Sequence, residues 1–142
     1  MTVKRQMLIQ PYKPDYTENL GDNTGQYSDQ DIGKAVKYSG STMVLCADGD
    51  EIVGFVTSVE PGTKDGHSIG AVRKEGRMEA LDEAGSLTVG TAVVAGTAGT
   101  LGTLAKQNVK AAAGATVFTW VVIETGVGGT SGAGSTIIVE RV

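Results

Sequence analysis

Two stretches of the chain share one design: EIVGFVTSVEPG at residues 51–62 and TVFTWVVIETG at residues 116–126. Each is a dense run of β-branched and aromatic residues, which favour strands, followed by an acidic residue and a glycine, which favours a turn. Phe55 and Trp120 occupy matching places in the two stretches and lie 65 positions apart. Because a polar loop and another β-rich run follow each stretch, the sequence predicts two similar hairpins with long loops.

Strand signals continue through most of the chain. The sequence contains 21 glycines and only 3 prolines, and its apolar residues are mainly Val, Ile and Ala, a combination typical of short strands and tight turns. Strands are expected within residues 31–40, 41–51, 51–60, 69–81 (two strands around Gly76), 82–96, 116–126 and 136–142. In residues 104–113, Ala and Lys favour a helix, but the turn-rich flanks favour a strand or irregular structure. We therefore predict an all-β fold, either a small β-barrel or a β-sandwich.

The first 31 residues have a different character. Leu20 is the only aliphatic residue between Tyr12 and Ile32, so this segment cannot bury enough apolar area to fold alone. It is either a disordered tail or an extended N-terminal arm (residues 1–31) that lies on a partner, followed by a β-rich domain at residues 32–142. The partner contacts of such an arm would come from its apolar, aromatic and proline residues: Met7, Leu8, Ile9, Pro11, Tyr12, Pro14 and Tyr16.

The second of the two opening stretches predicts a covered strand. Residues 117–123 are apolar at nearly every position, whereas a strand with one face in solvent alternates apolar and polar side chains. Either the core and a loop cover both faces, or a neighbouring subunit covers one. In the second case the subunit contact would use Phe118, Trp120 and Val122.

Few residues could carry out chemistry. The only histidine is His67 and the only cysteine is Cys46, so a single chain cannot build the common zinc sites, and a catalytic triad would depend on His67 alone. Cys46 lies in an apolar run and is expected to be a small buried residue. The acidic residues of ADGDE (47–51) could hold Ca²⁺ weakly, but they lack the further ligands of a calcium loop, so a solvated turn is the better interpretation.

The glycine-rich loops do not match nucleotide-binding motifs. GVGGTSGAGS (126–135) has Ser131 where a dinucleotide fingerprint needs glycine, and it leads into a strand. In GSLTVGT (85–91), Thr91 stands where a phosphate-binding loop has lysine. The net charge of −4 and the lack of a basic stripe argue against a nucleic-acid partner. No run approaches the ~20 apolar residues of a membrane span, so we expect a soluble protein. The lack of catalytic, metal-binding and nucleotide-binding motifs leads us to expect no cofactor, no metal and no enzymatic activity.

From Ile32 onward the order of motifs resembles the small capsid cement or decoration proteins of tailed bacteriophages. The matching stretches are IGKAV (32–36), DGDEIVGFVTSVE (48–60), LTVGTAVVAG (87–96), AGTLGTL (98–104), VFTWVVIETG (117–126) and GAGSTIIVERV (132–142). They cover roughly the last three-quarters of the chain, and they consist of small-residue patterns around glycine rather than a catalytic signature.

This resemblance implies a structural protein on the outer capsid surface of a virion, made in the host cytoplasm. It would bind the major capsid protein where capsomers meet and stabilise the expanded head, as a homo-oligomer, with a trimer favoured over a dimer. The alternative is a glycan-binding, adhesin-like β module, which would need exposed aromatic residues on one face; the chain offers Tyr12, Tyr16, Tyr27 and Tyr38. A small β-fold enzyme is the least favoured interpretation.

Overall fold

The fold is all-β, as the sequence predicts. The computed structural model describes residues 15–21, 27–60, 68–97 and 106–142. Its strands are β1 (Asp15–Leu20), β2 (Ala35–Ser39), β3 (Thr42–Leu45), β4 (Gly54–Glu60), β5 (Ser68–Arg73), β6 (Arg77–Asp82), β7 (Ala92–Ala95), β8 (Asn108–Ala111), β9 (Trp120–Glu124) and β10 (Ser135–Arg141). Two short 3₁₀ helices, η1 (Asp29–Asp31) and η2 (Val127–Gly129), precede β2 and β10.

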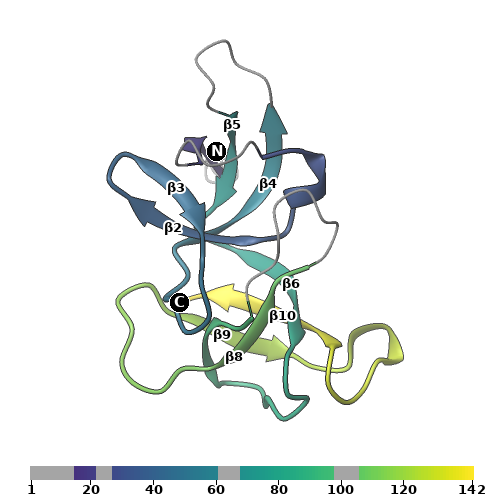
Figure 1. Ribbon diagram of the computed structural model, residues 1–142. Coiled ribbons are helices and arrows are strands. Elements are labelled where there is room, and N and C mark those ends of the chain that lie inside the picture. The colour runs from purple at the N-terminus through teal and green to yellow at the C-terminus, as the bar shows by residue number, and fades with distance from the viewer. Residues whose placement is uncertain (1–14, 22–26, 61–67, 98–105) are drawn as a thin grey trace, which may run out of the picture.

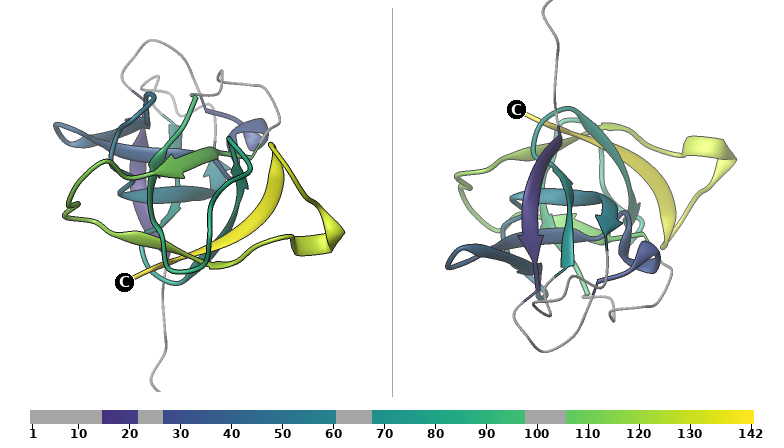
Figure 2. Two further views of the ribbon diagram at one scale, coloured as in Figure 1. Left: turned by 90° about the horizontal axis from the view of Figure 1, so that it is seen from below. Right: turned by 90° about the horizontal axis from the view of Figure 1, so that it is seen from above.

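The strands close into two barrels, and the chain passes from the first to the second through residues 74–76. The first barrel has the order β1-β3-β2-β4-β5, and the second has the order β6-β8-β7-β9-β10. These orders are the same when each barrel is counted from its own first strand, including a short parallel pairing of the first strand with the third. Figure 1 shows the first barrel above the second, and the end-on views of Figure 2 show them stacked.

Each barrel also has one backbone hydrogen bond at a place equivalent to that in the other barrel. The N–H of Gly33 donates to the Val56 carbonyl at 2.7 Å, and the N–H of Gly90 donates to the Val122 carbonyl at 2.7 Å. Both glycines have positive φ, +96° and +94°, a backbone conformation that residues with a Cβ rarely adopt. The sequence prediction of two similar hairpins is therefore confirmed in β4–β5 and β9–β10, and the similarity extends to whole barrels.

The structural repeat differs by one residue from the repeat seen in the sequence. Val56 and Val122, which make the equivalent backbone bonds, lie 66 positions apart rather than 65. Because side chains alternate along a strand, a shift of one residue moves a side chain to the other face. Phe55 and Trp120 are therefore not equivalent: Phe55 belongs to the cluster that fills the second barrel, whereas Val56 lies in the cluster of the first.

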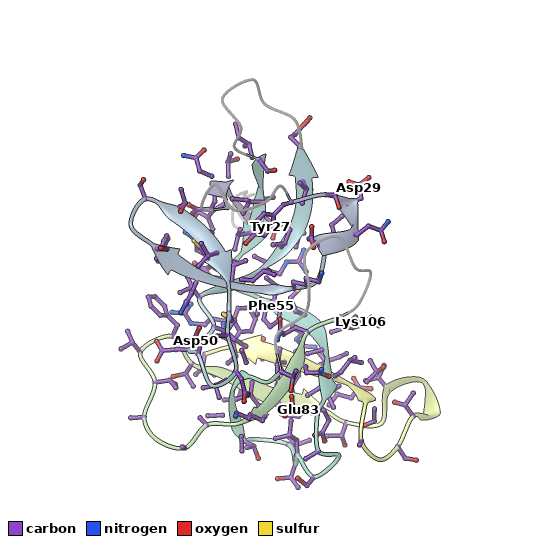
Figure 3. The ribbon with its side chains drawn as sticks, viewed as in Figure 1. Tyr27, Asp29, Asp50, Phe55, Glu83 and Lys106 are labelled. Atoms are coloured by element: carbon purple, nitrogen blue, oxygen red, sulfur yellow. The ribbon has the colours of Figure 1, made fainter. Side chains whose placement is uncertain are left out.

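The contact between Phe55 and Trp120 joins the two barrels in one core. Their ring centroids lie 4.9 Å apart with an interplanar angle of 83°, an edge-to-face arrangement. Figure 3 shows Phe55 at the level where the two barrels meet. Ile52 and Cys46 of the first barrel lie in the same buried cluster as the apolar side chains of the second. Burial of this shared apolar surface favours unfolding of both barrels together.

Hydrogen bonds between the barrels reinforce this core. The Glu51 carboxylate accepts from the N–H groups of Val117 and Phe118 at 2.8 and 3.0 Å. The buried Gln107 side chain accepts from the Ala35 N–H at 3.0 Å, although 72 positions separate the two residues. The Gln107 bond satisfies a backbone N–H that is buried at the junction, and the Glu51 bonds add a second link between the barrels.

One sequence prediction needs correction in the N-terminal region. The predicted arm of residues 1–31 includes β1, which pairs with β5 from Asp15 to Leu20 and closes the first barrel. Leu20 is buried in the core of that barrel. The prediction is wrong here because one buried leucine suffices when the neighbouring strands supply the rest of the core. Residues 1–14 and 22–26 lie outside the described residues.

The other strands lie where the sequence places them. Each predicted range from residue 31 onward overlaps the expected strand, with bounds that differ by one residue for β5, β6 and β10, and β5 and β6 flank Gly76. The ambiguous range 104–113 contains strand β8 (Asn108–Ala111), which pairs with β7. Pairing with β7 therefore outweighs the helix propensity of Ala and Lys.

Candidate partner-binding surface

Two exposed tyrosines from different strands lie close to one lysine on the outside of the first barrel. Tyr16 of β1 is 42% exposed and Tyr38 of β2 is 46% exposed. The Nζ atom of Lys74 lies 4.8 Å from the ring centroid of Tyr16 and 5.0 Å from that of Tyr38. Both distances are within the range of a cation–π interaction, so one lysine brings together two rings that β1 and β2 present separately. We call these three residues the tyrosine cluster.

Hydrogen bonds hold the tyrosine cluster in place. Lys74 Nζ donates to the Glu18 carboxylate and to the Tyr38 hydroxyl, and the Tyr16 hydroxyl donates to Glu75 at 3.0 Å. Burial alone would lower the pKa of Lys74, but its bonds to Glu18 and Tyr38 outweigh that effect and raise the pKa above its ordinary value. The ammonium group therefore stays charged at neutral pH, and the hydroxyls of both tyrosines have hydrogen-bond partners within the chain.

An ordered pair of exposed tyrosines suits recognition of another molecule. Tyrosine is enriched at the centres of protein interfaces, since a large, rigid ring buries much area at a small entropic cost. The tyrosine cluster also lies beside the start of the described chain, because Tyr16 is the second residue of β1. A partner that contacts the cluster could therefore also contact residues that precede Asp15.

The predicted partner contacts fall into two groups. Met7, Leu8, Ile9, Pro11, Tyr12 and Pro14 lie outside the described residues, so their role stays a prediction. Tyr16 lies in the tyrosine cluster, on the wall of the barrel rather than on an arm. Sequence reasoning did not find Tyr38 or Lys74 as its neighbours, because only the closure of the barrel brings residues 16, 38 and 74 together.

The predicted subunit contact is wrong for two of its three residues. Trp120 and Val122 are completely buried inside the chain's own core, so they have no surface to offer a second subunit. Phe118 is half-buried against the core of the first barrel, with the guanidinium of Arg141 5.0 Å from its ring centroid. Val117 is 81% exposed, so only part of residues 117–123 is covered. The first barrel supplies the cover that the sequence assigned to a loop or a neighbour.

The candidate chemical groups of the sequence have structural roles where they are described. Burial raises the pKa of the Cys46 thiol to about 12, which keeps it protonated and unreactive, as expected for a small buried residue. In the acidic turn, Asp48 pairs with Lys110 at 2.8 Å and Asp50 pairs with Lys37 at 2.5 Å. His67 lies outside the described residues.

The described residues show neither a metal site nor a membrane-spanning helix. Within the described ranges, no three His, Cys, Asp or Glu side chains gather as a metal site would require. Over the same parts of the chain, none of the helices has the length and apolar character needed to cross a bilayer.

Comparison with known proteins finds no relative from which a function could be taken over. Protein-family models, curated proteins and solved structures give no match to this chain.

Proposed function

We propose that this chain is a structural protein of a bacteriophage virion. It binds the major capsid protein on the outside of the capsid, at capsomer junctions, and stabilises the expanded head. The observation that carries the proposal is the tyrosine cluster, an exposed aromatic surface on the first barrel. That barrel shares one core with the second. The motif resemblance from residue 32 onward supplies the kind of partner.

The physical basis of such stabilisation is mass action. A protein that binds only the expanded shell lowers the free energy of that state relative to all others. Many copies that bridge neighbouring capsomers add avidity, so no single contact has to be strong. A homo-oligomer, with a trimer favoured and a dimer as the alternative, would multiply the contacts further. A rigid pair of barrels fits this role because little conformational entropy is lost on binding.

Cosedimentation tests the proposal directly. Purified protein is mixed with expanded heads of the parent phage that lack it, and the pellet is analysed for both proteins. We expect saturable binding at a fixed ratio to the shell subunit, and heads that then resist heat or low salt. Folded protein that stays in the supernatant at every concentration would overturn the proposal.

The tyrosine cluster should dominate the binding energy. Replacing Tyr16 or Tyr38 with alanine is expected to weaken shell binding about 30-fold, the effect of removing one interface residue worth about 2 kcal/mol. The measurement is the concentration of protein that half-saturates the heads. Val89→Ala is the matched control, because Val89 is an exposed apolar residue (64%) on the second barrel. If the two tyrosine variants bound the heads as tightly as Val89→Ala, the tyrosine cluster would not be the contact.

The N-terminal segment should add to the contact without contributing to the barrel. Because β1 begins at Asp15, deleting residues 1–14 leaves every strand of the first barrel in place. We expect this deletion to reduce occupancy on the heads while circular dichroism and the unfolding midpoint stay unchanged. Full occupancy after the deletion would remove Met7 to Pro14 from the binding surface.

The exposure of Tyr16 and Tyr38 around one lysine also favours a second candidate function, a glycan-binding, adhesin-like module. Exposed aromatic rings can pack against the apolar face of a sugar, and the nearby Glu18 and Glu75 could accept hydrogen bonds from its hydroxyls. Tyr27 does not contribute, because it is buried in the first barrel. A glycan array with no hits would remove this candidate, whereas hits that are lost in Tyr38→Ala would favour it over the capsid.

A further inference from the structure

A groove between the two barrels is lined by both apolar and charged residues. Its volume is about 410 Å³, and Ile32, Met78 and Ile138 supply the apolar lining. Ile32 comes from the first barrel, whereas Met78 and Ile138 come from β6 and β10 of the second. Pockets at such junctions are common binding sites, because two rigid bodies shape them together. We call it the junction groove.

The charged side chains that line the junction groove are mostly positive. Arg73, Arg77 and Lys106 line it together with one carboxylate, Glu79, although the whole chain carries a net charge of −4. Figure 3 shows Lys106 at the side of the molecule, at the level between the barrels. Each of these cations already has a carboxylate partner, so an anionic ligand would bind here by replacing those carboxylates rather than through a net positive potential.

Two of the three cations can turn toward an incoming ligand. The Arg77 side chain is 66% exposed, and its ion pair with Glu140 is long, at 3.5 Å. Lys106 is 46% exposed and pairs with Glu79 at 2.5 Å. Exposed ion pairs of this kind contribute little to stability, so a ligand carboxylate can replace the carboxylate of Glu140 or Glu79 at low cost. Arg73 is more firmly held, because its Nε donates to Asp15 at 2.9 Å and its Nη1 to the Arg77 carbonyl at 3.0 Å.

We propose that the junction groove binds an extended acidic peptide segment of the shell subunit, an inference that rests on the proposed function. One apolar side chain of the segment packs on Ile32, Met78 and Ile138, and flanking carboxylates meet Arg77 and Lys106. Arginine favours carboxylates because its planar guanidinium can donate two parallel hydrogen bonds. A nucleic acid would also bring negative charge, but the net charge of −4 on the chain would repel its long, highly charged backbone.

A short peptide tests the chemistry of the groove without any capsid. The probe is acetyl-Glu-Glu-Leu-Glu-Glu-amide, titrated into the full ¹⁵N-labelled protein, with acetyl-Lys-Lys-Leu-Lys-Lys-amide as the charge-reversed control. We expect saturable shifts at the backbone amides of Met78, Lys106 and Ile138 with the acidic peptide alone. No shifts at these amides, or equal shifts with both peptides, would overturn the proposal whatever the protein does on heads.

Charge reversal tests whether the shell uses the groove. Lys106→Glu and Arg77→Glu are each expected to weaken binding to expanded heads about fivefold or more, from one lost attraction and one new repulsion. Lys110→Glu is the matched control, because Lys110 also forms an exposed ion pair, at 2.8 Å with Asp48, but does not line the junction groove. If the wild type binds heads and all three variants bind equally well, the groove proposal fails while the proposed function stands. If the wild type does not bind heads, the proposed function fails, and with it the assignment of the segment to the shell.

Discussion

Replacing Trp120 with alanine is expected to lower the free energy of unfolding by about 4 kcal/mol, the typical cost of removing a large buried aromatic side chain. Trp120 is among the largest fully buried side chains of the described residues, and its ring meets Phe55 across the junction. Removing it leaves a cavity that neither barrel can fill without moving the other. Denaturant titration followed by circular dichroism measures the change.

Two controls separate burial from other effects of this substitution. Trp120→Phe should cost less than about 1.5 kcal/mol, because most of the apolar contact remains and the indole N–H has no hydrogen-bond partner among the described residues. Val117→Ala, at a side chain that is 81% exposed on the same segment, should change stability by less than about 0.5 kcal/mol. A Trp120→Ala protein as stable as Val117→Ala would contradict the shared core.

Replacing Gly70 with alanine is expected to lower the free energy of unfolding by about 3 kcal/mol, the upper range for forcing extra atoms into a packed site. A Cβ at this position would lie 2.3 Å from the Ser58 carbonyl oxygen and 2.7 Å from Cδ1 of Leu20. Ser58 belongs to the irregular part of β4, where the pairing with β5 shifts register, and a bulge of this kind brings backbone close to the facing strand. Thermal and denaturant unfolding measure the loss.

Gly114→Ala is the matched substitution in open space. A Cβ at Gly114 would meet no atom within 4 Å, and its backbone does not have positive φ. Alanine there restricts the unfolded chain, so stability should stay the same or rise by up to about 1 kcal/mol. If Gly70→Ala and Gly114→Ala behaved alike, glycine content and not the close approach to Ser58 would explain the result.

Local patterns predict the strands but not how they assemble. The turns at Gly76 and at residues 48–50 can be read from the sequence because glycine and aspartate favour turns wherever they stand. Strand β1 could not be predicted from local patterns, because its only buried aliphatic residue is Leu20 and its stability comes from the pairing of six residues with β5. The number of barrels could not be predicted either, because two similar hairpins can belong to one barrel or to two.

The candidate site could be predicted only in part. Tyr16 stands out in the sequence because it is an aromatic residue in a polar segment. Its neighbours Tyr38 and Lys74 are distant in sequence and are ordinary strand and turn residues when read locally. For Trp120 the sequence predicts a partner contact where there is none. An apolar run looks the same whether a second subunit or the chain's own first barrel covers it. The structure shows that the first barrel covers it, because the one-residue offset of the repeat turns Phe55 toward Trp120.

A force applied between the two barrels cannot be absorbed by the connection that joins them. Only residues 74–76 separate β5 from β6, and Arg141 of β10 donates a hydrogen bond to the Lys74 carbonyl at 3.0 Å. The load therefore passes directly to the packed rings of Phe55 and Trp120 and to the Glu51 hydrogen bonds. Such a body transmits tension between two points of attachment with little stretch, and it yields by unfolding rather than by extending.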